Sequence, residues 1–360
     1  GDFNTAVGAL ALFANTTADS NTAVGDSALK ANTTGHSNVA VGCGSLATAT
    51  TGDNNTAIGL CSQHGTTTGE ENTSIGSNSM EENTTGDRNV AVGRRALQEN
   101  TTAEGNTAVG NSAMQNNTTG ASNVAVGNVA LDANTSGSQN TALGDAALGS
   151  TTTSDCNTAV GANALFKNNG GSKNTAMGVD AALCNTTANE NTAIGYNSMV
   201  TNTTGINNTA VGKSSLGALT EGIDNTALGS NAGDALTDAD YNVAVGMQAL
   251  SGDTLGSRST AIGRRSLYTQ NFETATDTYN TAVGFNSGYS VTTGTDNTLI
   301  GGMSGDAISD GNTNTAVGSY SLTTNQRGDR NTAIGHEALK VLKKKKNLRL
   351  IDAKNFKMEN

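Results

Sequence analysis

The chain contains no proline and no tryptophan, and aromatic residues make up only 3 % of its 360 residues. A chain so poor in large rings cannot fill an ordinary globular core, in which aromatic and aliphatic side chains dominate the packing. No segment approaches the roughly 20 consecutive apolar residues that a membrane-spanning helix needs. We therefore expect neither a conventional globular domain nor insertion into a membrane.

Charge is also sparse, since charged residues are 14 % of the chain and the net charge is −11. Residues 340–360 hold eight basic and two acidic side chains, so the acidic excess belongs to the rest of the chain. An acidic surface repels nucleic acid and anionic lipid, and we expect neither as a partner. We expect residues 340–360 to form a basic tail or cap, either solvated or in contact with an anionic surface.

What the chain does contain is one pentapeptide, Asn-Thr-Ala-Val-Gly, which returns every 17 residues in twenty copies between Asn4 and Gly335. A single step is longer, the 21 residues from Ser259 to Asn280. A short period held over this length indicates one small structural unit stacked on itself. The sequence therefore predicts one solenoid domain over residues 1–339, followed by the tail at 340–360.

The repeat can be analysed position by position when the asparagine of the pentapeptide is counted as position 1. Position 5 is glycine in every copy and position 15 usually is, which predicts either a positive φ angle or very close backbone packing. Position 4 is always Val, Ile, Leu or Met, position 3 is Ala with two exceptions, position 8 is Ala or Ser, and position 9 is mostly Leu or Met. The expected structural residues of the clearest copy are Asn21, Ala23, Val24, Gly25, Ala28, Leu29, Asn32 and Gly35.

The fold class follows from the length and composition of this unit. Seventeen residues are too few for a two-helix repeat, and the β-branched, asparagine and glycine content opposes helix. The sequence predicts an all-β chain, a β-solenoid in the form of a flattened β-roll with two short strands per turn. At about 4.8 Å per turn, about 20 turns would extend on the order of 95 Å.

The strand itself predicts self-association. In an extended segment, Thr22 and Val24 face one side and Asn21 and Ala23 the other. Both sides carry apolar or Thr side chains in most copies, so both faces are expected to be dry. A dry second face needs another layer, and we expect a fibrous homo-oligomer, with an end-to-end filament as the alternative assembly.

Asparagine recurs at position 1 and often at position 12, where Asn32 is an example. Stacked on successive turns, such amides can form a hydrogen-bonded ladder. The Asn-Thr-Thr triplets at position 12 are also acceptors for N-glycosylation. We favour the structural interpretation.

The four extra residues fall within 266–279 and should form a surface loop, because an insertion kept inside the stack would shift the register of later turns. This segment holds Tyr268, Phe272 and Tyr279, which are candidate contact residues. A tolerated insertion without a function is the alternative.

Residues that would carry chemistry do not align in the repeat. His36, His64 and His336 occupy three different positions, and we expect no acidic position to recur. We therefore predict no enzymatic activity, no cofactor and no metal site. Cys43 and Cys61 lie on adjacent turns and could form a disulfide, although free thiols are the alternative.

Two families resemble this repeat. Asn-Val-Ala-Val-Gly at 38–42 with Ser45, and Asn-Thr-Ala-Ile-Gly at 191–195 with Ser198, are similar to the head repeats of trimeric autotransporter adhesins. The longer pattern NTAVGxxALxxNTTG, over about residues 4–339, is similar to shaft repeats of tail-fibre and surface-fibre proteins of phages, large viruses and bacteria. The first resemblance implies a trimeric left-handed β-roll that binds host surfaces.

The sequence thus predicts a structural fibre of a viral or cell-surface appendage, outside the cell, whose partner is itself, with a trimer favoured. One alternative is an adhesin whose repeat surface binds a host glycan or receptor. A second is an ice-binding solenoid, but Thr33 and Thr34 are adjacent and would point to opposite sides of an extended chain.

Overall fold

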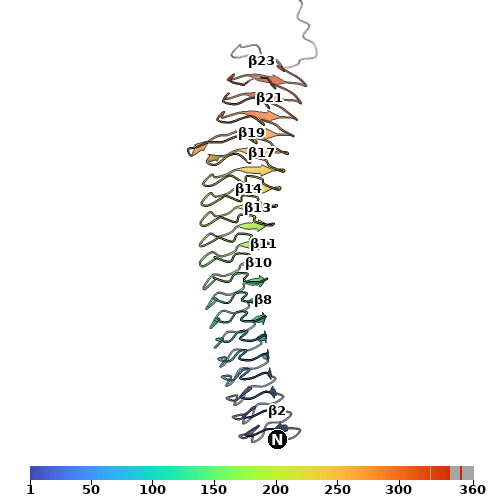
Figure 1. Ribbon diagram of the computed structural model, residues 1–360, viewed down its shortest axis with the longest axis vertical. Helices are drawn as coiled ribbons and strands as arrows, with labels where there is room; N and C mark the ends of the chain where they lie inside the picture. The colour runs from blue at the N-terminus through green and yellow to red at the C-terminus, as the bar shows by residue number, and fades with distance from the viewer. Residues whose placement is uncertain (325, 341–348, 351–360) are drawn as a thin grey trace, which may run out of the picture. The chain divides into compact units, whose positions relative to one another are not determined.

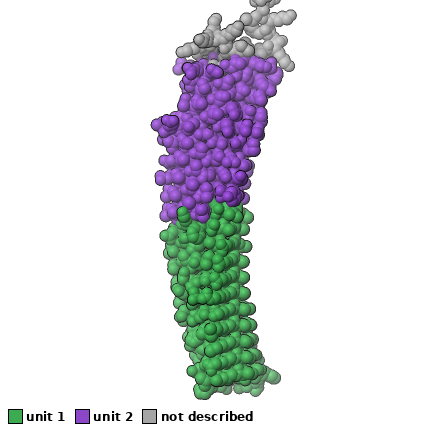
Figure 2. Space-filling view, viewed as in Figure 1, with its two compact units in different colours: residues 1–180 green, residues 181–360 purple. Residues whose placement is uncertain are grey.

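The computed structural model describes residues 1–324, 326–340 and 349–350. It divides into two compact units, unit 1 (Gly1–Asp180) and unit 2 (Ala181–Asn360), which are coloured separately in Figure 2. Every regular element in the described residues is a β-strand, and no helix long and apolar enough to span a bilayer is found among them. Each unit is a parallel β-solenoid, which confirms the predicted fold class.

Each unit is built from very short strands spaced mostly 17 residues apart. Unit 1 contains β1 (Thr5–Val7), β2 (Thr22–Val24), β3 (Val39–Val41), β4 (Thr56–Ile58), β5 (Thr73–Ile75), β6 (Val90–Val92), β7 (Thr107–Val109), β8 (Val124–Val126), β9 (Thr141–Leu143), β10 (Thr158–Val160) and β11 (Thr175–Met177). Unit 2 contains β12 (Thr192–Ile194), β13 (Thr209–Val211), β14 (Thr226–Leu228), β15 (Val243–Val245), β16 (Gly256–Ser257), β17 (Thr260–Ile262), β18 (Thr276–Asp277), β19 (Thr281–Val283), β20 (Thr298–Ile300), β21 (Thr315–Val317), β22 (Thr332–Ile334) and β23 (Arg349–Leu350).

The strands pair in parallel and in register, one from each turn (Figure 1). Thr22 lies between Thr5 and Val39, and Ala23 lies between Ala6 and Ala40. Each repeat position therefore stacks on the same position of the next turn. Within a unit, a residue type that recurs at one position forms a continuous column of like side chains.

The two strands expected in each turn are reduced to one, apart from the short pair β16 and β18. The physical reason is the backbone after the strand. Ser27 at position 7 and Leu29 at position 9 have φ angles of 57° and 47°, and the same positions are left-handed in most other turns. A left-handed residue at every second position prevents an extended run, so this side of the turn is built from bends.

Hydrogen bonds between turns compensate for this unusual backbone. The Leu29 amide donates to the Ser45 carbonyl at 3.0 Å, and the Ala31 amide donates to the Ala47 carbonyl at 3.1 Å. The buried backbone groups thus find partners on the next turn, although the segment is not a strand.

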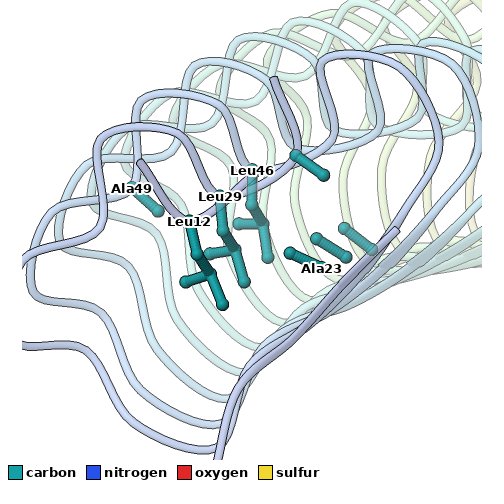
Figure 3. Packing of buried hydrophobic residues seen from close by; sticks show 8 residues of the cluster. Leu12, Ala23, Leu29, Leu46 and Ala49 are labelled. Carbon is teal, nitrogen blue, oxygen red and sulfur yellow. The ribbon is translucent and has the colours of Figure 1, made fainter. Parts of the chain in front are cut away.

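The core is only one side chain thick. Ala23, Ala28 and Leu29 are fully buried, and Leu12, Leu29 and Leu46 stack on one another through the centre of the first turns of unit 1 (Figure 3). Because alanine faces leucine across this narrow interior, the turn closes without any aromatic side chain, which explains the composition of the chain.

The two glycine positions are required for different reasons. Gly25 at position 5 has a φ angle of 139°, and a Cβ atom there would lie 2.5 Å from the Gly42 carbonyl oxygen. Gly35 at position 15 needs no positive φ, but a Cβ atom would lie 2.6 Å from Asn32 Oδ1 and would overlap the Gly52 carbonyl. Position 5 therefore combines both of the explanations offered by the sequence, whereas position 15 needs glycine only for close packing.

The insertion leaves the strand register intact, as predicted. Thr260 pairs with Thr281 and Ala261 with Ala282, although the step between them is four residues longer than usual. The extra residues project from unit 2 (Figure 1), and β18 pairs in parallel with β16. At the C-terminal end, β23 pairs with β22, while most of the predicted tail at 340–360 lies outside the described residues.

Candidate interaction surface

The outer face of the strands is uncharged, built from Thr and aliphatic side chains, and at least partly open to solvent. Ala23 and the other residues at position 3 turn inward, whereas the side chains at positions 2 and 4 turn outward. The exposed fractions are 36 % for Val24, 38 % for Ile58 and 49 % for Leu228. Exposed fractions between 37 % and 58 % are found at Val7, Ile75, Val126, Leu143, Met177, Ile262, Ile300 and Ile334. We call the outward side chains at positions 2 and 4 the sheet face.

The sheet face carries no charge in any copy. Position 2 is Thr or Val and position 4 is Val, Ile, Leu or Met in all twenty. Inside the turn, Ala23 and Asn21 are fully buried against residues of the same chain. Both faces of the strand were expected to be dry. The inner face, with positions 1 and 3, is buried by the turn itself, whereas no described residue covers the outer face, with positions 2 and 4. Extended apolar patches of this kind usually mark interaction sites.

The buried asparagines form the predicted ladder, with a more specific pattern than amide stacking. The Asn21 side-chain amide donates to the Gly35 carbonyl of its own turn at 2.8 Å, and its oxygen accepts the Asn38 backbone amide of the next turn at 2.9 Å. At position 12, the Asn100 amide donates to Asn83 Oδ1 at 2.8 Å. These side chains hold the turns together.

Burial of the asparagine at position 12 also determines whether the Asn-Thr-Thr triplets can be glycosylated. Asn32 is fully buried, and its amide donates to the Gly35 carbonyl at 2.9 Å. An oligosaccharyl group cannot be attached to such a nitrogen in the folded unit, so the structural interpretation is the one that the geometry supports.

The paired threonines after Asn32 also differ from each other. Thr33 donates its hydroxyl to the Thr50 carbonyl at 3.0 Å and is half-buried, whereas Thr34 is exposed. The hydroxyl at position 13 is thus used inside the stack, and only position 14 offers a solvent-facing hydroxyl in this corner.

An acidic position does recur, contrary to our expectation. Position 16 is Asp or Glu in many turns, and where it is Asp the carboxylate accepts a backbone amide from the preceding turn. Asp87 Oδ1 accepts the Glu70 amide at 2.8 Å, and Asp155 Oδ1 accepts the Ser138 amide at 2.7 Å. Ser257 serves the same purpose through its hydroxyl, so the shared role of position 16 is that of a hydrogen-bond acceptor. This recurrence was visible in the sequence at Asp53, Glu70, Asp87 and Glu104.

The insertion is anchored by a buried polar network. Asp253 replaces asparagine at position 12 and is fully buried. Its carboxylate accepts the Gly256 amide at 3.0 Å, the Phe272 amide at 3.1 Å and the Gln270 side-chain amide at 2.6 Å. Burial raises the pKa of Asp253, and these hydrogen bonds oppose that effect only in part.

Gln270 connects this anchor to the asparagine ladder. It donates to the Ser259 hydroxyl at 2.7 Å and accepts the Asn280 side-chain amide at 2.9 Å. Ser259 is the single copy without asparagine at position 1, and its hydroxyl also lies 2.6 Å from that of Thr278. The exception in the repeat is therefore the place where the insertion is joined to the core.

The candidate contact residues of this segment lie in different environments. Phe272 is buried, at 7 % exposure, and belongs to the anchor. Tyr268 is half-buried and stacks on Tyr289, with ring centroids 5.2 Å apart. Tyr279 is 55 % exposed. Only Tyr279 of the three is therefore well placed to contact another molecule.

Tyr279 has neighbours that the repeat pattern did not single out. The Arg258 guanidinium lies 4.6 Å from the centroid of the Tyr241 ring and donates through Nε to Asp277 at 2.9 Å. The Tyr279 hydroxyl lies 3.3 Å from the same carboxylate. One signal was available in the sequence, because six of the chain's twelve Tyr and Phe residues lie between Tyr241 and Tyr289.

The four cysteines are free thiols. Cys43 and Cys61 form no disulfide with each other, although the Cys61 amide donates to the Cys43 carbonyl at 2.9 Å. Burial, with smaller effects of Glu81 and Cys43, raises the pKa of the Cys61 thiol, so it is a poorer nucleophile than an ordinary cysteine. His64 lines an open hollow beside them. In the described part of the chain, no three His, Cys, Asp or Glu side chains are placed to hold a metal.

The chain was compared with protein-family models and with curated proteins, and neither comparison produced a match. The function must therefore be argued from the geometry of the sheet face and of the insertion.

Proposed function

We propose that this protein is a non-enzymatic structural fibre protein, and that copies of it associate through the sheet face to form the shaft of a viral or cell-surface appendage. The observation that carries the proposal is the uncharged, outward-facing column at positions 2 and 4, of which Val24, Ile58 and Leu228 are examples. A second copy of this chain offers a matching surface, because its sheet face has the same spacing and the same apolar character.

The energy of such an association depends on the number of turns. Burying the exposed two-fifths of a Val or Ile side chain contributes roughly 0.5–1 kcal/mol. Association costs several kcal/mol in lost translational and rotational freedom, about 4–15 by general estimates. One or two turns cannot offset this cost, whereas the eleven strands of unit 1 can. A long, uninterrupted face is thus what self-association by such small side chains requires.

Two features support a structural role over an enzymatic one. Polar side chains at positions 1, 12, 13 and 16 are engaged in holding turns together, as Asn21, Thr33 and Asp87 show. The outward side chains at position 4 are apolar in every copy. A trimer is the assembly that the resemblance to adhesin heads implies, and a location outside the cell follows from the same resemblance.

Sedimentation velocity tests this proposal. The intact chain should sediment near three times its 36.1 kDa mass. Ile75→Glu places a charge on the sheet face, at a side chain that is 40 % exposed, and should shift the protein toward the monomer because each charge would have to be desolvated at the interface.

Thr85→Glu is the matched control, since Thr85 is exposed at position 14, away from the sheet face, and should leave the assembly unchanged. A wild-type chain that sediments as a 36.1 kDa monomer at all concentrations would overturn the proposal.

A further inference from the structure

We propose that unit 2 carries a binding site for neutral oligosaccharides beside the insertion, formed by Tyr241, Arg258, Asp277 and Tyr279. This goes beyond the structural role and holds whether or not copies of the chain associate.

The site is built on one column of the solenoid. Tyr241 and Arg258 both occupy position 17, on successive turns, so they stack at the strand spacing of about 4.8 Å per turn, and Tyr279 is the last residue of the longer turn that follows. The Arg258 amide donates to the Asp240 carbonyl at 2.9 Å, which fixes the two neighbouring turns against each other. Tyr241 is 44 % and Tyr279 is 55 % exposed, and the Arg258 guanidinium lies over the Tyr241 ring, so a ligand would contact the solvent-exposed part of each tyrosine.

The insertion completes this column. Asp277 belongs to β18, which is held by pairing with β16, and its carboxylate contacts both Arg258 Nε and the Tyr279 hydroxyl. The loop between Gln270 and β18 is tied down by the buried Phe272 and Asp253. A loop that were merely tolerated would not need a buried carboxylate with three donors, and pre-organisation of this kind lowers the entropic cost of binding.

The chemistry of the four side chains selects the ligand. Aromatic rings have a negative face, against which the partially positive C–H edges of a sugar ring pack. Arginine supplies only donors and a carboxylate supplies only acceptors, and together they match neighbouring hydroxyl groups, which both donate and accept. Arg258 is already paired with Asp277, so the site has no excess positive charge for an anionic ligand. The net charge of −11 opposes anionic glycans further.

A protein partner fits these observations less well. Binding centres between proteins need contiguous apolar area around their aromatic residues. Here the exposed rings are separated by the Arg258–Asp277 ion pair, so each ring is bordered by charge. Two rings on turns two apart would be bridged by a short oligosaccharide better than by a single sugar.

The experiment is isothermal titration of the intact chain with cellohexaose, maltohexaose, chitohexaose and a galactose-terminated oligosaccharide, together with the sialylated form of the last. We expect at least one neutral oligosaccharide to bind, and the sialylated form to bind more weakly. Tyr241→Ala and Tyr279→Ala should each weaken binding about tenfold or more, the usual effect of truncating a central aromatic contact. Arg258→Gln should weaken it as well.

Two further variants make the result specific. Tyr279→Phe keeps the ring and loses the hydroxyl contact with Asp277, and it should retain most of the affinity. Tyr196→Ala removes an equally exposed tyrosine, 52 % accessible and elsewhere in unit 2, and should change nothing. Absence of binding to every neutral oligosaccharide, tighter binding of the sialylated form, or equal losses in Tyr196→Ala and Tyr279→Ala would each overturn the proposal.

Discussion

At the scale of single residues, this fold depends on glycine, because it leaves no space for a Cβ atom at position 5. Position 5 is invariant because two conditions coincide there. The φ angle of Gly110 is 141°, and a Cβ atom on it would lie 2.7 Å from the Gly127 carbonyl carbon of the next turn. Either condition alone would select glycine, and together they leave no alternative residue.

Gly110→Ala should therefore destabilise unit 1 by about 3–5 kcal/mol, because the backbone of two turns must move apart. The measurement is the midpoint of thermal unfolding followed by circular dichroism. Gly105→Ala is the control, since Gly105 has a φ angle of 69° but its nearest neighbour is Ser122 Oγ at 3.8 Å. This control should cost only about 1 kcal/mol. Equal losses in the two variants would contradict the close-approach argument.

At the scale of the element, part of the structure of the turn can be predicted from the sequence. The strand at Thr22–Val24, the inward Ala28 and Leu29 and the asparagine ladder all follow from the periodic pattern, because each is set by contacts between identical positions of adjacent turns. The left-handed backbone at Ser27 and Leu29 could not be predicted, since neither residue type favours a positive φ angle by itself.

The insertion was located correctly from the sequence, but its internal structure was not. Its anchor joins Asp253 to Gln270 and Phe272, and these contacts are specific to one pair of turns, so they leave no periodic signal. The same reason explains why Tyr241 and Arg258 were missed as neighbours of Tyr279. The periodic pattern predicted the contacts that recur in every turn, whereas the candidate binding site consists of contacts that occur only once.

Asp253 makes the insertion dependent on pH. Burial raises the pKa of this carboxyl group in the folded state, so the folded protein holds the proton more tightly than the unfolded chain does. Its contribution to stability is therefore largest below the usual pKa of aspartate, near 4, and declines as the pH rises through the folded-state pKa.

Urea unfolding of the wild type and of Asp253→Asn, measured from about pH 4 to pH 8, tests this expectation. The stability of the wild type relative to the variant should decrease as the pH rises. Asp238→Asn, which alters an exposed carboxylate of the same unit, is the control. A difference that grows with pH would contradict the assignment of the sign.

At the scale of the whole molecule, the repeat makes the number of turns adjustable. Every turn contacts only its neighbours, so stability is approximately a sum over turns and the interfaces between them. Deleting residues 89–105 removes one complete repeat and brings Arg88 next to Asn106, which can accept the role of Asn89 in the ladder.

We expect this deletion to leave the β-sheet circular dichroism spectrum per residue unchanged and the midpoint of unfolding within a few degrees of the wild type. Deleting only residues 89–96 removes β6 and leaves half a turn that cannot close, and it should unfold part of unit 1. Similar behaviour of the two deletions would contradict the view that the turn is the unit of stability.

The asparagine ladder has a direction, and that direction matches the order in which a ribosome makes the chain. The Asn21 side-chain amide donates to Gly35 and so closes its own turn. Its side-chain oxygen accepts the backbone amide of Asn38, which is translated later. Each finished turn thus presents a ready acceptor to the turn that follows. The chain can fold behind the ribosome one turn at a time, without waiting for a distant partner segment.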